Sequence, residues 1–173
     1  RVYVQRNIYD EFCQAAVEYA KTLKVGDPLD ESTDIGPMIA EKEAVRIEEW
    51  VKTAAESGAK ILVGGHRNGS FFEPTILTDT KDDMNVICKE TFAPVFSIMP
   101  YDDIEEAIAS VNNSNYGLQA GVFTKSLPVA HLCAEKIETG GVIINDGSTF
   151  RMDNMPYGGV KDSGIGREGP EYA

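Results

Sequence analysis

The sequence predicts an α/β fold with a mainly parallel sheet and flanking helices. Short apolar runs typical of strands alternate along the chain with amphipathic segments of ten or more residues that have helical spacing. Parallel strands need a crossover connection, usually a helix, so this alternation favours a parallel sheet. The length of 173 residues and the 42% hydrophobic content suffice for one buried core, and we expect a single domain over residues 1–173.

The charge and cysteine content argue against several function classes. A formal net charge of −12 disfavours nucleic acid and anionic membranes as partners, because both are bound by clustered Lys and Arg. No apolar run approaches the roughly 20 residues needed to cross a bilayer, and the first residues lack the pattern of a secretory signal. The three cysteines, Cys13, Cys88 and Cys133, lack metal-ligand spacing and suit a reducing compartment. We therefore expect a cytoplasmic protein without a metal site.

The first part of the chain is expected to form a strand and two helices. Residues 1–5 alternate like a strand and begin without an initiator Met, which indicates that an upstream segment is missing. Asp10 is the expected N-cap of a helix that ends before Gly26, and residues 41–57 are expected to form a second helix that Gly58 stops. The side chains expected to face inward are Phe12, Ala16, Tyr19, Ala20 and Leu23 in the first helix and Ile47, Val51, Ala54 and Ala55 in the second.

The remaining elements continue the alternation. Strands are expected over residues 60–63, 71–77, 95–99 and 142–145, and helices over residues 103–112 and 128–138. Pro74 limits how centrally its strand can pair, and the apolar run at 142–145 is typical of a strand buried on both faces. The Gly- and Pro-rich stretch at 146–173 is expected to be an ordered loop region that serves a site.

Three segments of the chain carry a specific pattern. Residues 89–95 read KETFAPV, residues 115–123 read NYGLQAGVF, and residues 156–169 read PYGGVKDSGIGREG. In this order and spacing they resemble the aldehyde dehydrogenase superfamily, and the resemblance covers nearly the whole chain. It implies the C-terminal part of the catalytic domain of an NAD(P)-dependent enzyme, without the dinucleotide-binding domain and the final strand used in subunit pairing.

The resemblance implies a cofactor role for Glu90 and Phe92. In the family, the Glu of this segment holds hydroxyls of the nicotinamide ribose and the Phe packs near the nicotinamide ring. A carboxylate can accept two hydrogen bonds from a vicinal diol, and an apolar ring helps to fix the face of the nicotinamide. Spacing alone favours the alternative, in which Glu90 caps a loop and Phe92 fills the core, and only the family pattern favours the cofactor role.

The family mechanism requires groups that this chain does not supply. The resemblance implies attack of a cysteine thiolate on the aldehyde, hydride transfer to NAD or NADP, and hydrolysis of the thioester by water that a glutamate activates. The nucleophile and the general base are expected upstream of Arg1, so the chain by itself should be inactive. Cys88, two residues before Glu90, could be taken for the nucleophile of a shorter enzyme, but we reject this interpretation. Cys13 and Cys133 fall on helices, where a small buried hydrophobe is the usual role.

Residues 164–169 spell the G-x-G-x-x-G pattern of a dinucleotide-binding loop. That motif should follow an apolar strand and open a helix. Here Lys161, Asp162 and Ser163 precede it, and the chain ends soon after it. We therefore expect no phosphate-binding role for these glycines.

The loop before this segment is expected to shape the substrate entrance. The substrate-binding residues implied by the resemblance are Ser148, Thr149, Phe150, Arg151 and Tyr157. A guanidinium at such a position is suited to clamp a carboxylate, phosphonate or phosphate at the far end of a short aldehyde. The alternatives are a surface Arg151 paired with Asp153, and an apolar tunnel lined by Phe150 and Tyr157 for an uncharged aldehyde.

The expected function is therefore that of part of an enzyme that oxidises a small aldehyde to a carboxylate. The parent protein is expected to be a homo-oligomer, a dimer or tetramer, with no nucleic acid or membrane partner. Two alternatives stay open: a non-enzymatic relative that acts as a binding module, and an enzyme that transfers the thioester to coenzyme A.

Overall fold

The computed structural model describes residues 1–171, which form parts of two compact units, one over Arg1–Tyr101 and one that begins at Asp102. The expectation of a single domain stays a prediction. None of the helices in residues 1–171 is long and apolar enough to cross a membrane.

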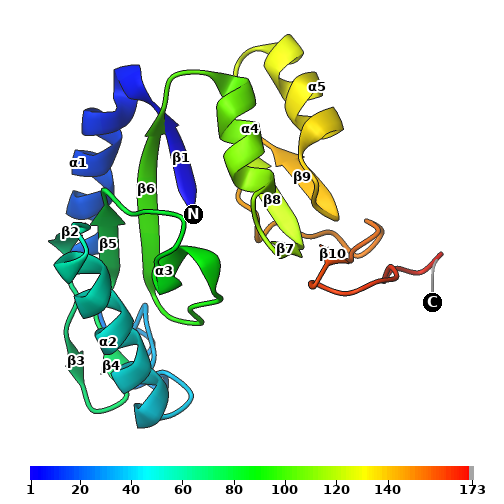
Figure 1. Cartoon of the computed structure of the whole chain (residues 1–173). Helices are drawn as coiled ribbons and strands as arrows, with labels where there is room; N and C mark the ends of the chain where they lie inside the picture. The colour runs from blue at the N-terminus through cyan, green and yellow to red at the C-terminus, as the bar shows by residue number, and fades with distance from the viewer. Residues whose placement is uncertain (172–173) are drawn as a thin grey trace. The chain divides into compact units, whose positions relative to one another are not determined.

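The first unit is built on a four-stranded sheet in the order β1-β6-β5-β2 (Figure 1). The strands are β1 (Val2–Gln5), β6 (Val95–Tyr101), β5 (Thr75–Thr78) and β2 (Lys60–Val63). β6 runs parallel to both β1 and β5, whereas β2 is antiparallel to β5. The predicted α/β class with a mainly parallel sheet is confirmed.

The first helix covers one face of this sheet. A 3-10 turn, η1 (Arg6–Ile8), leads into α1 (Tyr9–Ala20). The predicted N-cap is wrong: Ile8 caps α1 without a side-chain hydrogen bond, because η1 runs directly into the helix and places Asp10 inside its first turn.

The buried face of α1 also differs from the prediction. The residues that pack toward β1, β5 and β6 are Cys13, Ala16, Val17 and Ala20. Phe12 and Tyr19 are exposed. The helix therefore presents its small side chains to the sheet, on a stripe rotated away from the one that its larger apolar residues suggest.

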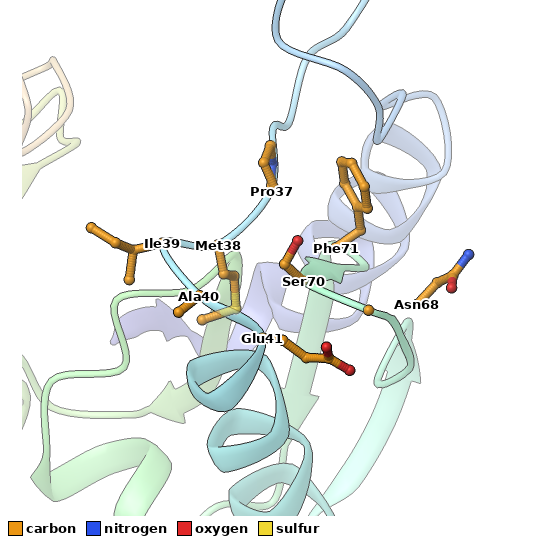
Figure 2. A pocket seen from close by; sticks show the side chains of 9 residues that line it. Pro37, Met38, Ile39, Ala40, Glu41, Asn68, Ser70 and Phe71 are labelled. Atoms are coloured by element: carbon orange, nitrogen blue, oxygen red, sulfur yellow. The ribbon is translucent and has the colours of Figure 1, made fainter.

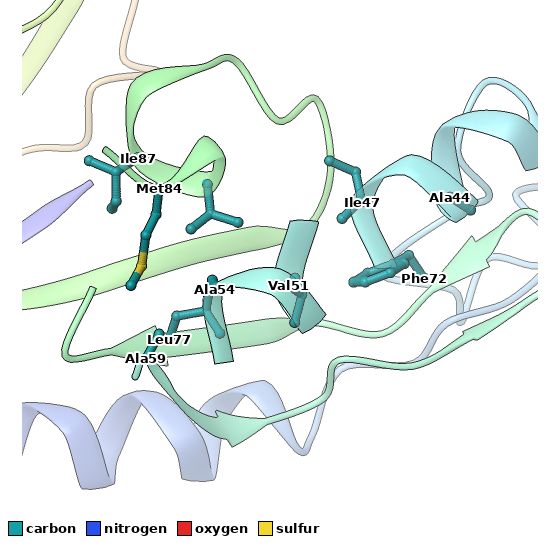
Figure 3. Packing of buried hydrophobic residues seen from close by; sticks show 10 residues of the cluster. Ala44, Ile47, Val51, Ala54, Ala59, Phe72, Leu77, Met84 and Ile87 are labelled. Atoms are coloured by element: carbon teal, nitrogen blue, oxygen red, sulfur yellow. The ribbon is translucent and has the colours of Figure 1, made fainter. Parts of the chain in front are cut away.

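The second helix covers the opposite face. Ile76 and Leu77 of β5 point to opposite sides of the sheet, as successive strand residues do, and Leu77 belongs to the core beneath α2 (Glu41–Glu56). The helix contributes Ala44, Ile47, Val51 and Ala54 to this core (Figure 3). As predicted, Gly58 follows the end of the helix, where it adopts a φ of 106° that favours glycine.

Short elements complete the first unit. A two-stranded hairpin of β3 (Arg67–Asn68) and β4 (Phe71–Phe72) precedes β5, and α3 (Asn85–Cys88) adds Val86 and Ile87 to the core beneath α2. The expected limit from Pro74 is wrong, because Pro74 lies just before β5 and removes no hydrogen bond from it. β5 thus occupies an interior position of the sheet.

The second unit pairs two strands in parallel and packs two helices on them. Its elements are α4 (Ile104–Asn112), β7 (Tyr116–Gly117), β8 (Gln119–Val122), α5 (Leu127–Lys136), β9 (Gly141–Ile144) and β10 (Val160–Lys161). β8 runs parallel to β9, and β10 pairs antiparallel with β7.

The core of the second unit lies between its helices and the β8–β9 pair. Ile108 of α4, together with Cys133 and Ile137 at the end of α5, is buried there. The prediction that the 142–145 run is buried on both faces is wrong for the described chain. β9 is partly exposed along its length, because β8 is its one strand partner in the second unit as described.

Candidate functional site

The turn over residues 89–94 joins α3 to β6 and is anchored at both ends. At its start, the backbone N–H of Lys89 donates to the carbonyl of Asn85 (3.1 Å). At its end, the carbonyl of Pro94 accepts from the N–H of Thr75 on β5 (2.8 Å). Backbone hydrogen bonds to α3 and β5 therefore fix where the turn begins and ends. We refer to residues 89–94 as the 89–94 turn.

The two residues predicted to contact a cofactor both lie on this turn and both face outward. The Glu90 carboxylate is exposed and has no hydrogen-bond or ion-pair partner within residues 1–171. Phe92 is 80% exposed, so it does not fill the core of its unit. Its φ of 48° lies in the left-handed region, which is uncommon for a bulky residue and typical of ligand-contacting segments.

Sequence reasoning missed a residue that contacts the same turn. Nη2 of Arg46, on α2, donates to the backbone carbonyl of Thr91 (3.0 Å), the residue between Glu90 and Phe92. The Arg46 guanidinium also stacks over the Trp50 ring at 4.3 Å from its centroid. Since 45 positions separate Arg46 from Thr91, no local sequence pattern indicates this contact.

The predicted substrate loop, residues 146–155, is held against β8 of the second unit. Nε2 of Gln119 donates to the carbonyl of Phe150 (2.7 Å), and Phe150 N–H closes a turn onto the carbonyl of Gly147 (3.1 Å). A Cβ at Gly121 would lie 2.7 Å from the carbonyl oxygen of Asp146, so only glycine fits there. The start of the loop is therefore placed by backbone contacts.

The structure brings together two of the five predicted substrate residues. The Arg151 guanidinium lies 4.3 Å from the centroid of the Tyr157 ring and pairs with Glu168 at 3.1 Å. The alternative partner Asp153 is thus wrong, because the loop returns Tyr157 alongside Glu168, where their backbones form two hydrogen bonds. Ser148 and Thr149 are exposed and make no side-chain hydrogen bond with the described residues.

The end of the same loop passes a second backbone at very short range. A Cβ built on Gly140, between α5 and β9, would lie 1.5 Å from the carbonyl oxygen of Gly158. A Cβ on Gly158 would in turn lie 2.3 Å from the carbonyl oxygen of Gly166. Real Cβ atoms do not approach backbone so closely, so both positions require glycine.

The G-x-G-x-x-G pattern at residues 164–169 does not form a phosphate loop. It follows the two-residue strand β10 and continues as turns rather than opening a helix. Within it, Glu168 pairs with the backbone of Tyr157 and with the side chain of Arg151. The structure therefore lacks the strand-to-helix context of a dinucleotide-binding loop at these glycines, and the absence of a phosphate-binding role stays a prediction.

None of the cysteines has the surroundings of a nucleophile. Burial raises the pKa of the Cys13 and Cys133 thiols, which lowers the fraction of reactive thiolate. The Cys88 thiol is exposed, and the contact that it makes is with the backbone carbonyl of Asp83 (3.8 Å) rather than with a base. The chain therefore lacks an activated thiol of its own among the described residues.

A hollow beside the hairpin of β3 and β4 has none of these residues in its lining. Met38, Ile39, Glu41, Ser70 and Phe71 are among the residues that line it (Figure 2). Its one ionisable side chain, Glu41, pairs with Arg67 at 3.2 Å, and Ile39 is 95% exposed. The hollow has no set of groups for acid–base or nucleophilic chemistry.

Comparison with known sequences decides the family. A sequence model described as "Aldehyde dehydrogenase family" matches residues 1–173, the whole chain. The chain belongs to the aldehyde dehydrogenase family. The resemblance carried by the three segments is thereby confirmed.

Relatives of this aldehyde dehydrogenase chain cover it almost completely. A 3-sulfolactaldehyde dehydrogenase of Priestia aryabhattai is 57% identical over 173 residues, which are 100% of this chain and 36% of the relative. The crystal structure of aldehyde dehydrogenase 21 from Physcomitrella patens, in complex with the reaction product succinate, has a TM-score of 0.96 and 48% identity over 98% of this chain and 35% of that chain. Glyceraldehyde-3-phosphate dehydrogenase GapN from Methanocaldococcus jannaschii, complexed with NADP, has a TM-score of 0.94 and 46% identity over 98% of this chain and 37% of that chain.

The chain thus spans about a third of the length of the aldehyde dehydrogenases that it matches. The high TM-scores show that this third has the family's fold.

Proposed function

We propose that this chain is part of an NAD(P)-dependent enzyme that oxidises a short anionic aldehyde to the corresponding carboxylate. In the proposal, Glu90 and Phe92 contact the dinucleotide, and Arg151 contacts the anionic end of the aldehyde. The observation that carries it is the outward presentation of Glu90 and Phe92 on the 89–94 turn, in a chain of the aldehyde dehydrogenase family.

The residues of the turn fit a nicotinamide ribose. The Glu90 carboxylate has no partner among the described residues, so both its oxygens are available to accept hydrogen bonds from the two ribose hydroxyls. The exposed Phe92 ring offers an apolar surface that orients a flat ring beside it. NAD(P), when bound, supplies the acceptor of the aldehyde hydride. Glu90 and Phe92 act by holding the reacting groups in one geometry.

The proposal takes the covalent chemistry from the rest of the full-length protein. We assign the thiolate that attacks the aldehyde, and the glutamate that activates water, to other parts of that protein. In this chain Cys133 is buried, Cys13 is half-buried, and the exposed Cys88 thiol contacts a backbone carbonyl. By itself, the chain is expected to show no aldehyde oxidation. We propose that water, rather than coenzyme A, accepts the acyl group of the thioester.

The anionic character of the substrate is supported by Arg151 and by the relatives. The names of the three relatives refer to sulfolactaldehyde, succinate and glyceraldehyde 3-phosphate, each of which carries an anionic group. Arg151 presents a half-exposed guanidinium whose planar fork matches carboxylate, sulfonate and phosphate oxygens. Phe150 and Tyr157 supply apolar surface on the same loop.

The proposal also covers location and assembly. Three free cysteines are compatible with a reducing compartment, and we infer a cytoplasmic enzyme. We infer a homo-oligomer, as in the expectation from the family, without nucleic acid or membrane partners.

The test is NAD(P) reduction by the full-length protein with a panel of short aldehydes, combined with Glu90→Gln. Removing a charged acceptor of ribose hydrogen bonds should raise KM for the dinucleotide about ten-fold or more, since such bonds contribute about 1.5–3 kcal/mol. Glu135→Gln is the matched control, because Glu135 on α5 is also exposed and has no partner among the described residues.

An unchanged KM and kcat in Glu90→Gln would overturn the cofactor assignment. If the unmodified protein turns over no aldehyde, the non-enzymatic binding module becomes the better description.

A further inference from the structure

We propose that Arg46 is a positioning residue that fixes the 89–94 turn in the conformation that presents Glu90 and Phe92 to the dinucleotide. This inference rests on the proposed function of the turn. It adds a residue of α2 to the determinants of cofactor affinity, although Arg46 is not itself required to touch the cofactor.

The middle of the turn needs support from outside. Its two ends are anchored to Asn85 and Thr75, but Phe92, near its centre, holds a left-handed φ of 48° with an exposed side chain. A bulky residue keeps such a conformation only where its surroundings determine it. Between the two anchors, the hydrogen bond that reaches the turn from another element of the described chain is the one from Arg46 to the Thr91 carbonyl.

The position of that hydrogen bond explains the orientation of the flanking side chains. Thr91 separates Glu90 from Phe92, and its carbonyl is directed at Arg46 on α2. Holding this peptide toward α2 leaves the side chains on either side exposed. If the Thr91 carbonyl were released, the turn would be free to relax the strained φ and to move both side chains.

Arg46 is itself held in place by two contacts on α2. Its Nε lies 2.7 Å from a carboxylate oxygen of Glu43, one helical turn earlier. Its guanidinium stacks over Trp50, which packs against the core of the first unit. The Lys89 ammonium, at the start of the turn, lies 5.5 Å from the centroid of the same ring. Trp50 therefore contacts a cation from the helix and a cation from the turn.

The geometry distinguishes Arg46 from an ordinary surface cation. The side chains of Arg46 and Glu43 are 28% and 29% exposed, whereas the pair of Lys52 and Glu56 on the same helix is 76% and 65% exposed at 3.9 Å. Arg46 uses separate nitrogens for Glu43 and for Thr91 while its plane stacks on Trp50. A lysine cannot make all three contacts at once, because it lacks a planar fork.

The experiment compares Arg46→Met and Arg46→Lys with the unmodified full-length protein. Arg46→Met keeps an extended apolar side chain over Trp50 but removes the donor to Thr91. We expect the Kd for the dinucleotide, measured by titration, to rise about ten-fold in Arg46→Met and by less in Arg46→Lys, which retains one donor. The KM for the aldehyde and the melting temperature should change little. Lys52→Met, which removes a cation from the same helix without a contact to the turn, should leave the Kd unchanged.

Glu90→Gln separates this inference from the function on which it rests. If Glu90→Gln weakens dinucleotide binding but Arg46→Met does not, the positioning role is wrong and the proposed function stands. If Glu90→Gln has no effect, the assignment of the turn to the cofactor is itself wrong. The positioning role would also be overturned if Arg46→Met weakened aldehyde binding as much as dinucleotide binding and lowered the melting temperature, since this indicates a general structural defect. The same holds if Lys52→Met raised the Kd for the dinucleotide as much as Arg46→Met does.

A double variant tests the route of the effect. Because Arg46 is proposed to act through the turn that carries Glu90, Arg46→Met should raise the Kd by a smaller factor in the Glu90→Gln background than in the unmodified protein. If the rise in Kd in the double variant equalled the product of the rises in the two single variants, action through the same turn would be contradicted.

Discussion

Replacing Arg151 by Met is the most direct test of an anion clamp on the substrate loop. In the structure the guanidinium is already engaged, at 3.1 Å from Glu168 and stacked over Tyr157. An anionic aldehyde must therefore displace Glu168 or share Arg151 with it. Met keeps the apolar stem against Tyr157 and removes the charge and all the donors.

The expected magnitude follows from these two competing contacts. A hydrogen bond to a charged group contributes about 1.5–3 kcal/mol. The pair of Arg151 and Glu168 is 45% and 70% exposed, and exposed pairs contribute at most about 1 kcal/mol. The net advantage of an anionic over a neutral aldehyde is then about 1–2 kcal/mol, which corresponds to about 5- to 30-fold in kcat/KM.

The assay measures kcat/KM for a sulfonate- or carboxylate-bearing aldehyde and for a neutral aldehyde of the same length, with the full-length protein. Arg151→Met should remove the selectivity for the anion and leave the neutral substrate nearly unchanged, and Arg151→Lys should retain part of the selectivity. Lys125→Met, which removes another exposed cation of the second unit, serves as the control. A loss shared equally by both substrates would refute the clamp and indicate that Arg151 supports the loop through Glu168 and Tyr157.

Two further predictions concern stability of the two units. Ile47→Ala removes a fully buried side chain from the core beneath α2 and should lower the free energy of unfolding by about 2–5 kcal/mol, measured by urea denaturation of the full-length protein; a loss below about 1 kcal/mol would show that the core refills the space. Asp103→Ala removes the N-cap carboxylate of α4, which accepts from the N–H groups of Glu105 (2.7 Å) and Glu106 (3.3 Å), and should cost about 1 kcal/mol in the same measurement. Asp103→Asn, which retains the cap acceptor, should cost less, and equal losses would contradict a capping role.

Elements with a strong periodic pattern were predictable from sequence, and those set by their neighbours were not. The apolar stripe of α2 and its glycine stop define that helix almost to the residue. By contrast, α3 has only four residues, too few for any periodicity. The start of α1 has no capping signal in the sequence because η1 continues into the helix, and its buried face depends on a sheet that accepts small side chains there.

The same distinction holds for the candidate site. Glu90 and Phe92 were recognised because their segment matches a family pattern, and not from their chemistry alone. Arg46 was missed because its contact with Thr91 depends on how α2 packs over the sheet. For Arg151, sequence proximity suggests Asp153 as the partner. The backbone pairing of Tyr157 with Glu168 instead brings Glu168, 17 residues from Arg151, to the guanidinium.

The close approach of Gly140 and Gly158 fixes the end of the substrate loop independently of the side chains within the loop. Since neither glycine tolerates a side chain, backbone contact at Gly158 sets where the loop rejoins its unit, as the contact of Gly121 with Asp146 sets where it leaves. Side chains between residues 148 and 155 can therefore vary in size and charge without moving the ends of the loop. A transplant of these residues between relatives, with both glycines retained, is the smallest exchange expected to transfer aldehyde preference from one enzyme to another.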